Sequence, residues 1–212
     1  MKKRIDKDDV IQLLNDIIAE MVNNRELLTE LDSAIGDGDL GINVVKGFKE
    51  VKKYLSSNAT SISRVLIESG IIFTKSTGST IGALLGTALI RAGKSVKGKT
   101  EIDAHDILEM MTAAEVGIIE RGKAKAGDKT ILDALIPARE AFSKAIELKK
   151  DLFESFKDAT FAAETGVIST IDMVAKVGRA RWLGERSIGH KDPGAFTFFL
   201  ILQIAEKSLK KL

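Results

Sequence analysis

VIQLLNDIIAEMV, residues 10–22, is the stretch that decides the fold class. Its apolar residues recur three and four positions apart, which places them on one face of an α-helix. The same period predicts further helices over 42–55, about 60–76, 79–92, 103–121, 129–147, 152–177 and 195–210. Only two prolines occur in 212 residues. We therefore expect an all-α fold of about eight antiparallel helices in a single domain covering 1–212.

The composition narrows the classes of partner and compartment. A net charge of +2 provides no strong field to attract nucleic acid or an anionic membrane. The absence of cysteine excludes disulfides and thiolate metal sites and suits a reducing compartment, so we expect a cytoplasmic protein. The basic N-terminus lacks the uninterrupted apolar core of a signal peptide, and no segment reaches the ~18–20 apolar residues of a membrane span.

Three carboxylates gather in LDSAIGDGDLGINVVKGF, residues 31–48, where Asp32, Asp37 and Asp39 surround two glycines. Carboxylates this close repel one another unless a cation lies between them. Oxygen ligands select Mg²⁺ or Ca²⁺ over zinc. An EF-hand is excluded because Ile42 and Phe48 would occupy its glycine and glutamate positions. The alternative is that the aspartates only cap helices, but three around two glycines favour a metal site.

Two further stretches resemble phosphate-binding loops. GKSVKGKT, residues 93–100, matches the P-loop pattern, but the preceding segment has a helical period, so we interpret it as a basic link between helices. KSTGSTIG, residues 75–82, opens a helix whose free N–H groups suit phosphate, although Ser and Thr there are also ordinary caps.

The segment GRARWLGERSIGHKDPG, residues 178–194, predicts a long loop before the last helix. Its Asp192-Pro193 pair is typical of a helix start. Long loops in compact domains are often functional. Of the two histidines, His190 in this loop is a better functional candidate than His105, which lies early in a helix.

Four blocks together resemble the nucleotide-binding L subunit of bacterial dihydroxyacetone kinases. They are LDSAIGDGDLGIN, GSTIGALLGTALIRAG, RGKAKAGDKTILDALIPA and GRARWLGERSIGHKDPGA, and they run in order through most of the chain. The resemblance implies an antiparallel barrel of eight helices with ADP or ATP bound at one end. It implies that Asp32, Asp37 and Asp39 carry the chemistry by holding a pair of Mg²⁺ ions. It assigns nucleotide contacts to Leu40, Gly41, Ile42, Asn43, Gly78, Ser79, Thr80, Ile81, Gly122, Ile131, Arg179, Asp192, Pro193 and Gly194.

The resemblance also implies partners. A separate K subunit binds dihydroxyacetone, and an M subunit of the phosphotransferase system recharges bound ADP in some members. The same residues serve an exchangeable ATP or a retained ADP, so both modes stay open.

Two residues depart from the family pattern: Leu40 replaces a usual histidine, and Ile81 replaces a usual serine. A leucine cannot donate a hydrogen bond to phosphate. These changes leave open a kinase for another short-chain sugar, or a regulatory module that binds nucleotide without efficient transfer.

Overall fold

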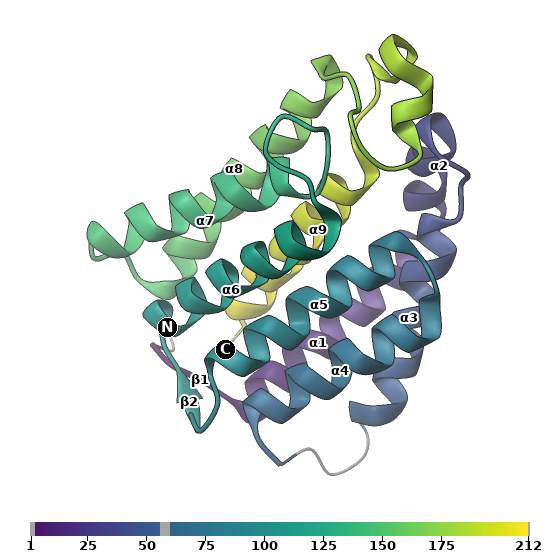
Figure 1. Cartoon of the computed structure of the whole chain (residues 1–212). Helices are drawn as coiled ribbons and strands as arrows, with labels where there is room; N and C mark the ends of the chain where they lie inside the picture. Colours follow the sequence, from purple (N-terminus) through teal and green to yellow (C-terminus); the bar gives the residue numbers. More distant parts are fainter. Residues whose placement is uncertain (1–2, 56–59, 212) are drawn as a thin grey trace.

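A computed structural model describes residues 3–55 and 60–211 (Figure 1). The α-helices within these residues are α1 (Lys7–Asn23), α2 (Arg25–Ile35), α3 (Leu40–Leu55), α4 (Ile62–Thr77), α5 (Thr80–Ser95), α6 (Ala104–Gly122), α7 (Leu132–Glu147), α8 (Leu152–Ser169) and α9 (Pro193–Leu209). Two 3₁₀ segments, η1 (Thr170–Asp172) and η2 (Ala180–Ser187), lie between α8 and α9. Strands β1 (Ile5–Asp6) and β2 (Glu101–Ile102) form one short antiparallel pair.

Eight of the helices form a closed ring. Going round it, α1 packs on α3, each helix from α3 to α9 packs on the next, and α9 returns to α1. The remaining helix, α2, covers one end of the ring and contacts α3 and η2. The predicted all-α barrel of eight helices is therefore confirmed, and α2 is an additional element.

The ring is held together by apolar side chains and by close helix contacts. Phe48 meets Phe73 edge to face at 4.8 Å between ring centroids, and Phe142 meets Phe156 in the same way at 5.2 Å. A Cβ on Gly70 of α4 would lie 2.5 Å from the carbonyl oxygen of Gly86 in α5. Small residues on these helices therefore serve tight packing, because a side chain at Gly70 would push α4 and α5 apart.

Helix direction alternates around the ring, so every second connection lies at the same end. This end collects four connections, 36–39, 78–79, 123–131 and 170–192. The β1–β2 pair lies toward the other end (Figure 1). The stretches that resemble the kinase family therefore converge on one end, because they lie at these four connections.

Two predicted helix limits were wrong, and one helix was not predicted. The segment 152–177 is not one helix, because α8 ends at Ser169, where the hydroxyls of Ser169 and Thr170 donate to carbonyls of the last turn. The segment 129–147 begins only at Leu132, because Lys129 has a left-handed φ of 63°. Helix α2 was not predicted, since it buries only a narrow face.

No helix among the described residues combines the length and the apolar character that crossing a membrane requires.

Candidate functional site

Three aspartates come together where α2 ends and α3 begins. Asp32 lies in α2, whereas Asp37 and Asp39 lie in the loop that follows. One carboxylate oxygen from each lies within 4.8 Å of the others. The backbone N–H of Leu40, at the start of α3, donates to Asp32 Oδ2 at 3.1 Å and orients that carboxylate. Because all three donors are hard oxygens, the cluster fits Mg²⁺ or Ca²⁺ rather than a softer metal.

The two glycines of this loop make the cluster possible. A Cβ on Gly36 would lie 2.4 Å from Asp32 Oδ1, so any larger residue would displace the buried carboxylate. Gly38 has a φ of 73°, in the left-handed region that glycine adopts without strain. The loop therefore turns tightly enough to return Asp37 and Asp39 to the end of α2.

A cation from the last connection already reaches the cluster. Arg179, which directly precedes η2, donates from Nη1 to the carboxylate of Asp37. Both side chains remain partly open to solvent, with exposed fractions of 69% and 36%. The guanidinium offsets part of the negative charge and joins η2 to the acidic loop.

Two helix starts face the same region. Ser79 caps α5, and its hydroxyl accepts from Gly82 N at 3.2 Å. Asp192 caps α9, accepting from Ala195 N at 2.6 Å, with Pro193 in the first turn. The N-terminus of a helix favours anions because its first N–H groups lack partners within the helix. The first turns of α5 and α9 therefore add positive potential to a site rich in carboxylates.

These elements enclose a cavity of about 220 Å³. Predicted site residues in its lining are Asp32, Asp37, Asp39, Leu40, Ser79, Thr80, Ile81, Gly122, Ile131, Arg179, Asp192, Pro193 and Gly194. The other lining residues are Ile35, Gly36, Leu84, Ile118, Ala124, Lys129, Thr130, Leu132, Val177, Gly178 and Ala180. The cavity thus combines an acidic edge with an apolar wall, an arrangement that suits a ligand with one charged and one flat apolar part.

Four predicted residues lie outside this lining. Gly41 faces α2, where a Cβ would lie 2.3 Å from the carbonyl oxygen of Arg25. The side chain of Ile42 is 47% exposed and lies in a groove beside the end of α1. Asn43 follows in α3, and Gly78 ends α4 with a φ of 61°. These residues therefore shape the elements around the cavity rather than its wall.

Lys129 is the main lining residue that the sequence did not indicate. Its exposed fraction is 2%, and its Nζ donates to backbone carbonyls of Met173, Ser187 and His190. A single lysine in a basic loop is ordinarily solvated, so composition offered no signal. Burial lowers the pKa of Lys129, and the negative charges of Asp192 and Asp172 oppose that effect.

Asp192 differs electrostatically from the acidic cluster. Burial raises the pKa of its carboxyl to about 7, although the hydrogen bond from Ala195 N acts in the opposite direction. The negative charge of Asp133 raises the pKa further, and the ammonium of Lys129 lowers it. Burial therefore favours the protonated form of Asp192 at acidic pH, unlike the carboxylates of the acidic cluster.

The remaining motifs play no part in the cavity. GKSVKGKT begins within the last turn of α5, with no strand before it, and leads to β2, which confirms that it links two elements and is not a P-loop. His105 lies in the first turn of α6, at the end of the ring opposite the cavity. The carbonyl of His190 accepts from Lys129, and its side chain is exposed.

Comparison with known proteins agrees with this architecture. The DAK2 domain family matches residues 34–207, which is most of the chain. The chain belongs to the DAK2 domain family. Within this family it is 39% identical over 202 residues to the ADP-binding subunit DhaL of a PEP-dependent dihydroxyacetone kinase of Listeria innocua, covering 94% of this chain and 93% of the relative. It is 36% identical to the corresponding Escherichia coli subunit, covering 88% and 89%.

A solved structure has the same fold as this DAK2 domain. The dihydroxyacetone kinase of C. freundii, in complex with AMP-PNP and Mg²⁺, superposes with a TM-score of 0.73 at 22% identity. The match covers 94% of this chain and 33% of that protein. The relatives named above are subunits of a phosphotransferase, and the L-subunit resemblance expected from the sequence is confirmed.

Proposed function

We propose that this chain is the nucleotide-binding, phosphoryl-transferring subunit of a Mg²⁺-dependent dihydroxyacetone (glycerone) kinase, with residues 1–212 forming one DhaL-type domain. The observation that carries the proposal is the meeting of three aspartates, two helix starts and Arg179 around one cavity. The two DhaL relatives, which are named ADP-binding subunits, support it.

In this proposal Asp32, Asp37 and Asp39 hold Mg²⁺, as a pair of ions. Their oxygen-only donor set and their 4.8 Å grouping fit that metal. Bound Mg²⁺ would neutralise charge on the nucleotide phosphates during transfer. Asp32 is the most constrained of the three, because Leu40 N holds one of its oxygens and Gly36 packs against the other.

The rest of the cavity places the nucleotide. Thr80 and Ile81, in the first turn of α5, offer backbone N–H groups to phosphate oxygens. Arg179 can leave Asp37 and pair with a phosphate, because its side chain is exposed at the cavity edge. Gly122 and Ile131 lie on the apolar side, which suits the base. Phosphoryl transfer needs mainly alignment and charge neutralisation, so no general base is required on this chain.

Partner subunits would supply the sugar substrate and the phosphoryl group that recharges the nucleotide. We propose that a separate K subunit brings dihydroxyacetone to the open end of the cavity. We propose in addition that an M subunit of the phosphotransferase system can recharge bound ADP, and that the complex works in the cytoplasm.

Thermal stabilisation tests this assignment. ADP with Mg²⁺ should raise the midpoint of thermal unfolding of the wild-type protein, because binding at 100 times the dissociation constant adds about 2.7 kcal/mol to the free energy of unfolding. Asp37→Ala should lose this stabilisation while its far-UV circular dichroism stays helical. Asp158→Ala, which removes a half-buried carboxylate paired with Lys150 and outside the cavity lining, is the control and should respond as wild type does. Retained Mg²⁺-dependent ADP binding in Asp37→Ala would refute the metal assignment.

Leu40 supports a second candidate, a regulatory module or a kinase for another short-chain sugar. Its side chain lines the cavity beside the aspartates and has no hydrogen-bonding group. An assay with a K subunit, Mg²⁺ and ATP that measures the sugar phosphate formed distinguishes these candidates. Tight nucleotide binding without any product favours the module. ADP that co-purifies and resists dialysis indicates recharging in place.

A further inference from the structure

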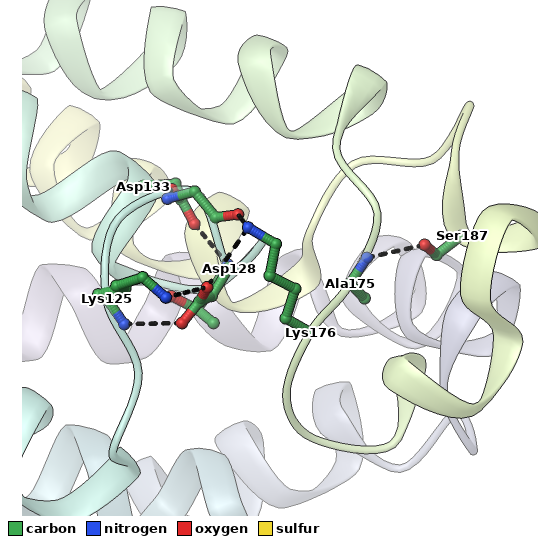
Figure 2. A network of polar contacts seen from close by, with 8 residues as sticks. Lys125, Asp128, Asp133, Ala175, Lys176 and Ser187 are labelled. Atoms are coloured by element: carbon green, nitrogen blue, oxygen red, sulfur yellow. Dashed lines mark hydrogen bonds and ion pairs between the residues drawn. The ribbon is translucent and has the colours of Figure 1, made fainter.

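Two of the connections at the cavity end are joined by a network of polar contacts (Figure 2). Lys176, in the connection between α8 and α9, donates from its backbone N–H to the carbonyl of Asp128 at 3.2 Å. Its Nζ donates to the carbonyl of Gly127 at 2.9 Å and lies 3.7 Å from Asp128 Oδ1. The connection 170–192 is therefore attached along its first part to the loop 123–131.

The loop 123–131 is itself firmly held. Asp133 accepts from Gly127 N at 2.5 Å and from Thr130 N at 2.7 Å. Asp128 accepts from Lys125 N at 3.0 Å, and burial of this carboxyl is outweighed by its lysine and backbone partners, which lower its pKa. Figure 2 shows these contacts side by side in the short loop before α7. The loop can thus serve as a fixed support.

Lys129 makes the deepest attachment between the two connections. Its Nζ lies 3.1 Å from Met173 O, 2.5 Å from Ser187 O and 2.7 Å from His190 O. An ammonium has three N–H donors and no acceptor, so these three carbonyls use its full capacity. Lys129 therefore has no donor left for a nucleotide phosphate, although it lines the cavity.

The residues that supply these three carbonyls lie close in the chain to two residues of the cavity lining. Met173 and Ser187 lie on either side of Arg179 in the chain, and His190 lies two positions before Asp192. A second bond, from Ala175 N to Ser187 Oγ at 2.9 Å, closes the same segment on itself. One buried ammonium thus gathers both ends of the segment that carries Arg179.

The backbone of Lys129 has a conformation that a loop would ordinarily give to glycine. A lysine at this position therefore indicates that its side-chain contacts matter. A φ of 63° is uncommon for any residue with a Cβ, and it persists where surrounding contacts hold it. At this conformation the side chain of Lys129 is buried, and its Nζ reaches the three carbonyls.

We propose that Lys129 is a positioning residue that holds the 173–190 segment over the cavity and so sets where Arg179 and Asp192 meet a bound nucleotide. The effect on nucleotide rests on the function proposed above, whereas the effect on the segment does not. The two can be measured separately.

The protein contains its own reporter for the segment. Trp182 is the only tryptophan of the chain, and it lies in η2 with an exposed fraction of 76%. The time-resolved anisotropy of its fluorescence therefore reports local motion of this segment without any label. In Lys129→Met, which keeps the stem and removes all three donors, we expect a larger fast component of depolarisation than in wild type.

Lys149→Met is the matched control. Lys149 also has a left-handed backbone, with a φ of 57°, but it is exposed in the turn between α7 and α8. Its replacement makes the same chemical change at the same backbone conformation, away from the cavity, and should leave the anisotropy of Trp182 and nucleotide binding unchanged.

Nucleotide binding supplies the second readout. Lys129→Met should weaken Mg²⁺-dependent ADP binding by about tenfold. Without the ammonium the 173–190 segment becomes ordered only when ADP binds, and the cost of ordering it reduces the binding free energy. In the complete kinase the Michaelis constant for nucleotide should rise more than the turnover number falls, since the metal ligands are untouched.

Chemical rescue separates positioning from general damage. The chain has no cysteine, so the thiol of a Lys129→Cys variant is unique and can be alkylated with 2-bromoethylamine in denaturant before refolding. The product carries an ammonium at nearly the length of lysine. Alkylation should restore both the anisotropy of Trp182 and ADP affinity, whereas the unmodified variant should behave as Lys129→Met does.

Each outcome decides a stated point. Unchanged Trp182 anisotropy in a folded Lys129→Met protein overturns the proposal, and so does increased motion with unchanged ADP affinity. Absence of ADP binding in wild type refutes the proposed function, and the anisotropy alone then decides whether Lys129 holds the segment. If Lys129→Met does not fold, Lys129→Gln replaces it, because its amide keeps two of the three N–H donors but carries no charge. Greater motion of Trp182 than in wild type then supports the proposal, and unchanged motion overturns it.

Discussion

The guanidinium of Arg179 donates to the carboxylate of Asp37, although 142 positions separate the two residues in the chain. The contact joins the connection between α8 and α9 to the acidic loop between α2 and α3. A protein cation thus lies on one side of the aspartate cluster.

Removing the guanidinium of Arg179 should raise the affinity for Mg²⁺ and lower the affinity for ADP. In Arg179→Ala, Mg²⁺ alone should bind up to about fivefold more tightly, because an exposed ion pair contributes roughly 0–1 kcal/mol. ADP in the presence of Mg²⁺ should bind more weakly, since a phosphate partner is lost. Isothermal titration calorimetry measures both. Arg181→Ala, at the residue stacked on Trp182, is the control; weaker binding of Mg²⁺ to Arg179→Ala would contradict the prediction.

Leu40→His restores the residue usual in the family at the edge of the cavity. A charge-assisted hydrogen bond to phosphate contributes ~1.5–3 kcal/mol, so ADP affinity should rise by about tenfold or more. Leu40 is also part of the apolar core, with an exposed fraction of 6%. Placing a polar ring there should lower the free energy of unfolding without nucleotide. Each 1 kcal/mol lost lowers the midpoint of thermal unfolding by about 2–4 °C in a domain of this size. An unchanged or lower ADP affinity would show that position 40 does not face phosphate here.

Gly41→Ala tests whether Gly41 serves packing. The added Cβ would meet Arg25 O at 2.3 Å and Thr29 N at 2.8 Å, both backbone atoms of α2 that cannot move alone. We expect a loss of about 1–3 kcal/mol in the free energy of unfolding in urea without nucleotide. Gly122→Ala is the matched comparison, because its Cβ would meet only the end of the Leu84 side chain at 3.3 Å. Equal stability of the two variants would argue against the packing role.

Asp192 makes a pH-dependent contribution to stability. Its pKa is about 7 in the folded protein, against ~3.9 in an unfolded chain. Between these values the folded state binds the additional proton, so this group lowers the free energy of unfolding as pH rises from about 4 to 7. Asp192→Asn keeps a capping side chain and removes the titration, and its stability should depend less on pH over this range.

Urea unfolding at several pH values, without nucleotide, measures this difference. Asp151→Asn, at the exposed cap of α8, is the control for the same substitution. A wild-type and an Asp192→Asn curve that run parallel from pH 4 to 7 would contradict the raised pKa.

Much of the architecture was predictable because it depends on neighbours along the chain. Apolar residues three and four apart specify a helix face wherever the helix later packs. Caps such as Ser79 and Asp192 act on N–H groups two or three positions away, so the starts of α5 and α9 were within two residues of the prediction. The end of α8 was predicted wrongly because Thr170 is recruited by Asp192, 22 positions later in the chain, whose N–H donates to its hydroxyl.

By itself, the sequence determined the all-α class, the acidic loop and the stretches that carry the family resemblance. Only the tertiary structure decided which residues share the cavity. Ile42 lies two positions from Leu40 and points elsewhere, because successive side chains on a helix diverge by about 100°. Lys129 was invisible in the pattern, since its three partners lie 44 to 61 positions away. Local periodicity shows which face of a helix is apolar. It cannot show that an ammonium is buried, because the carbonyls that bind Lys129 come close only when the ring of helices closes.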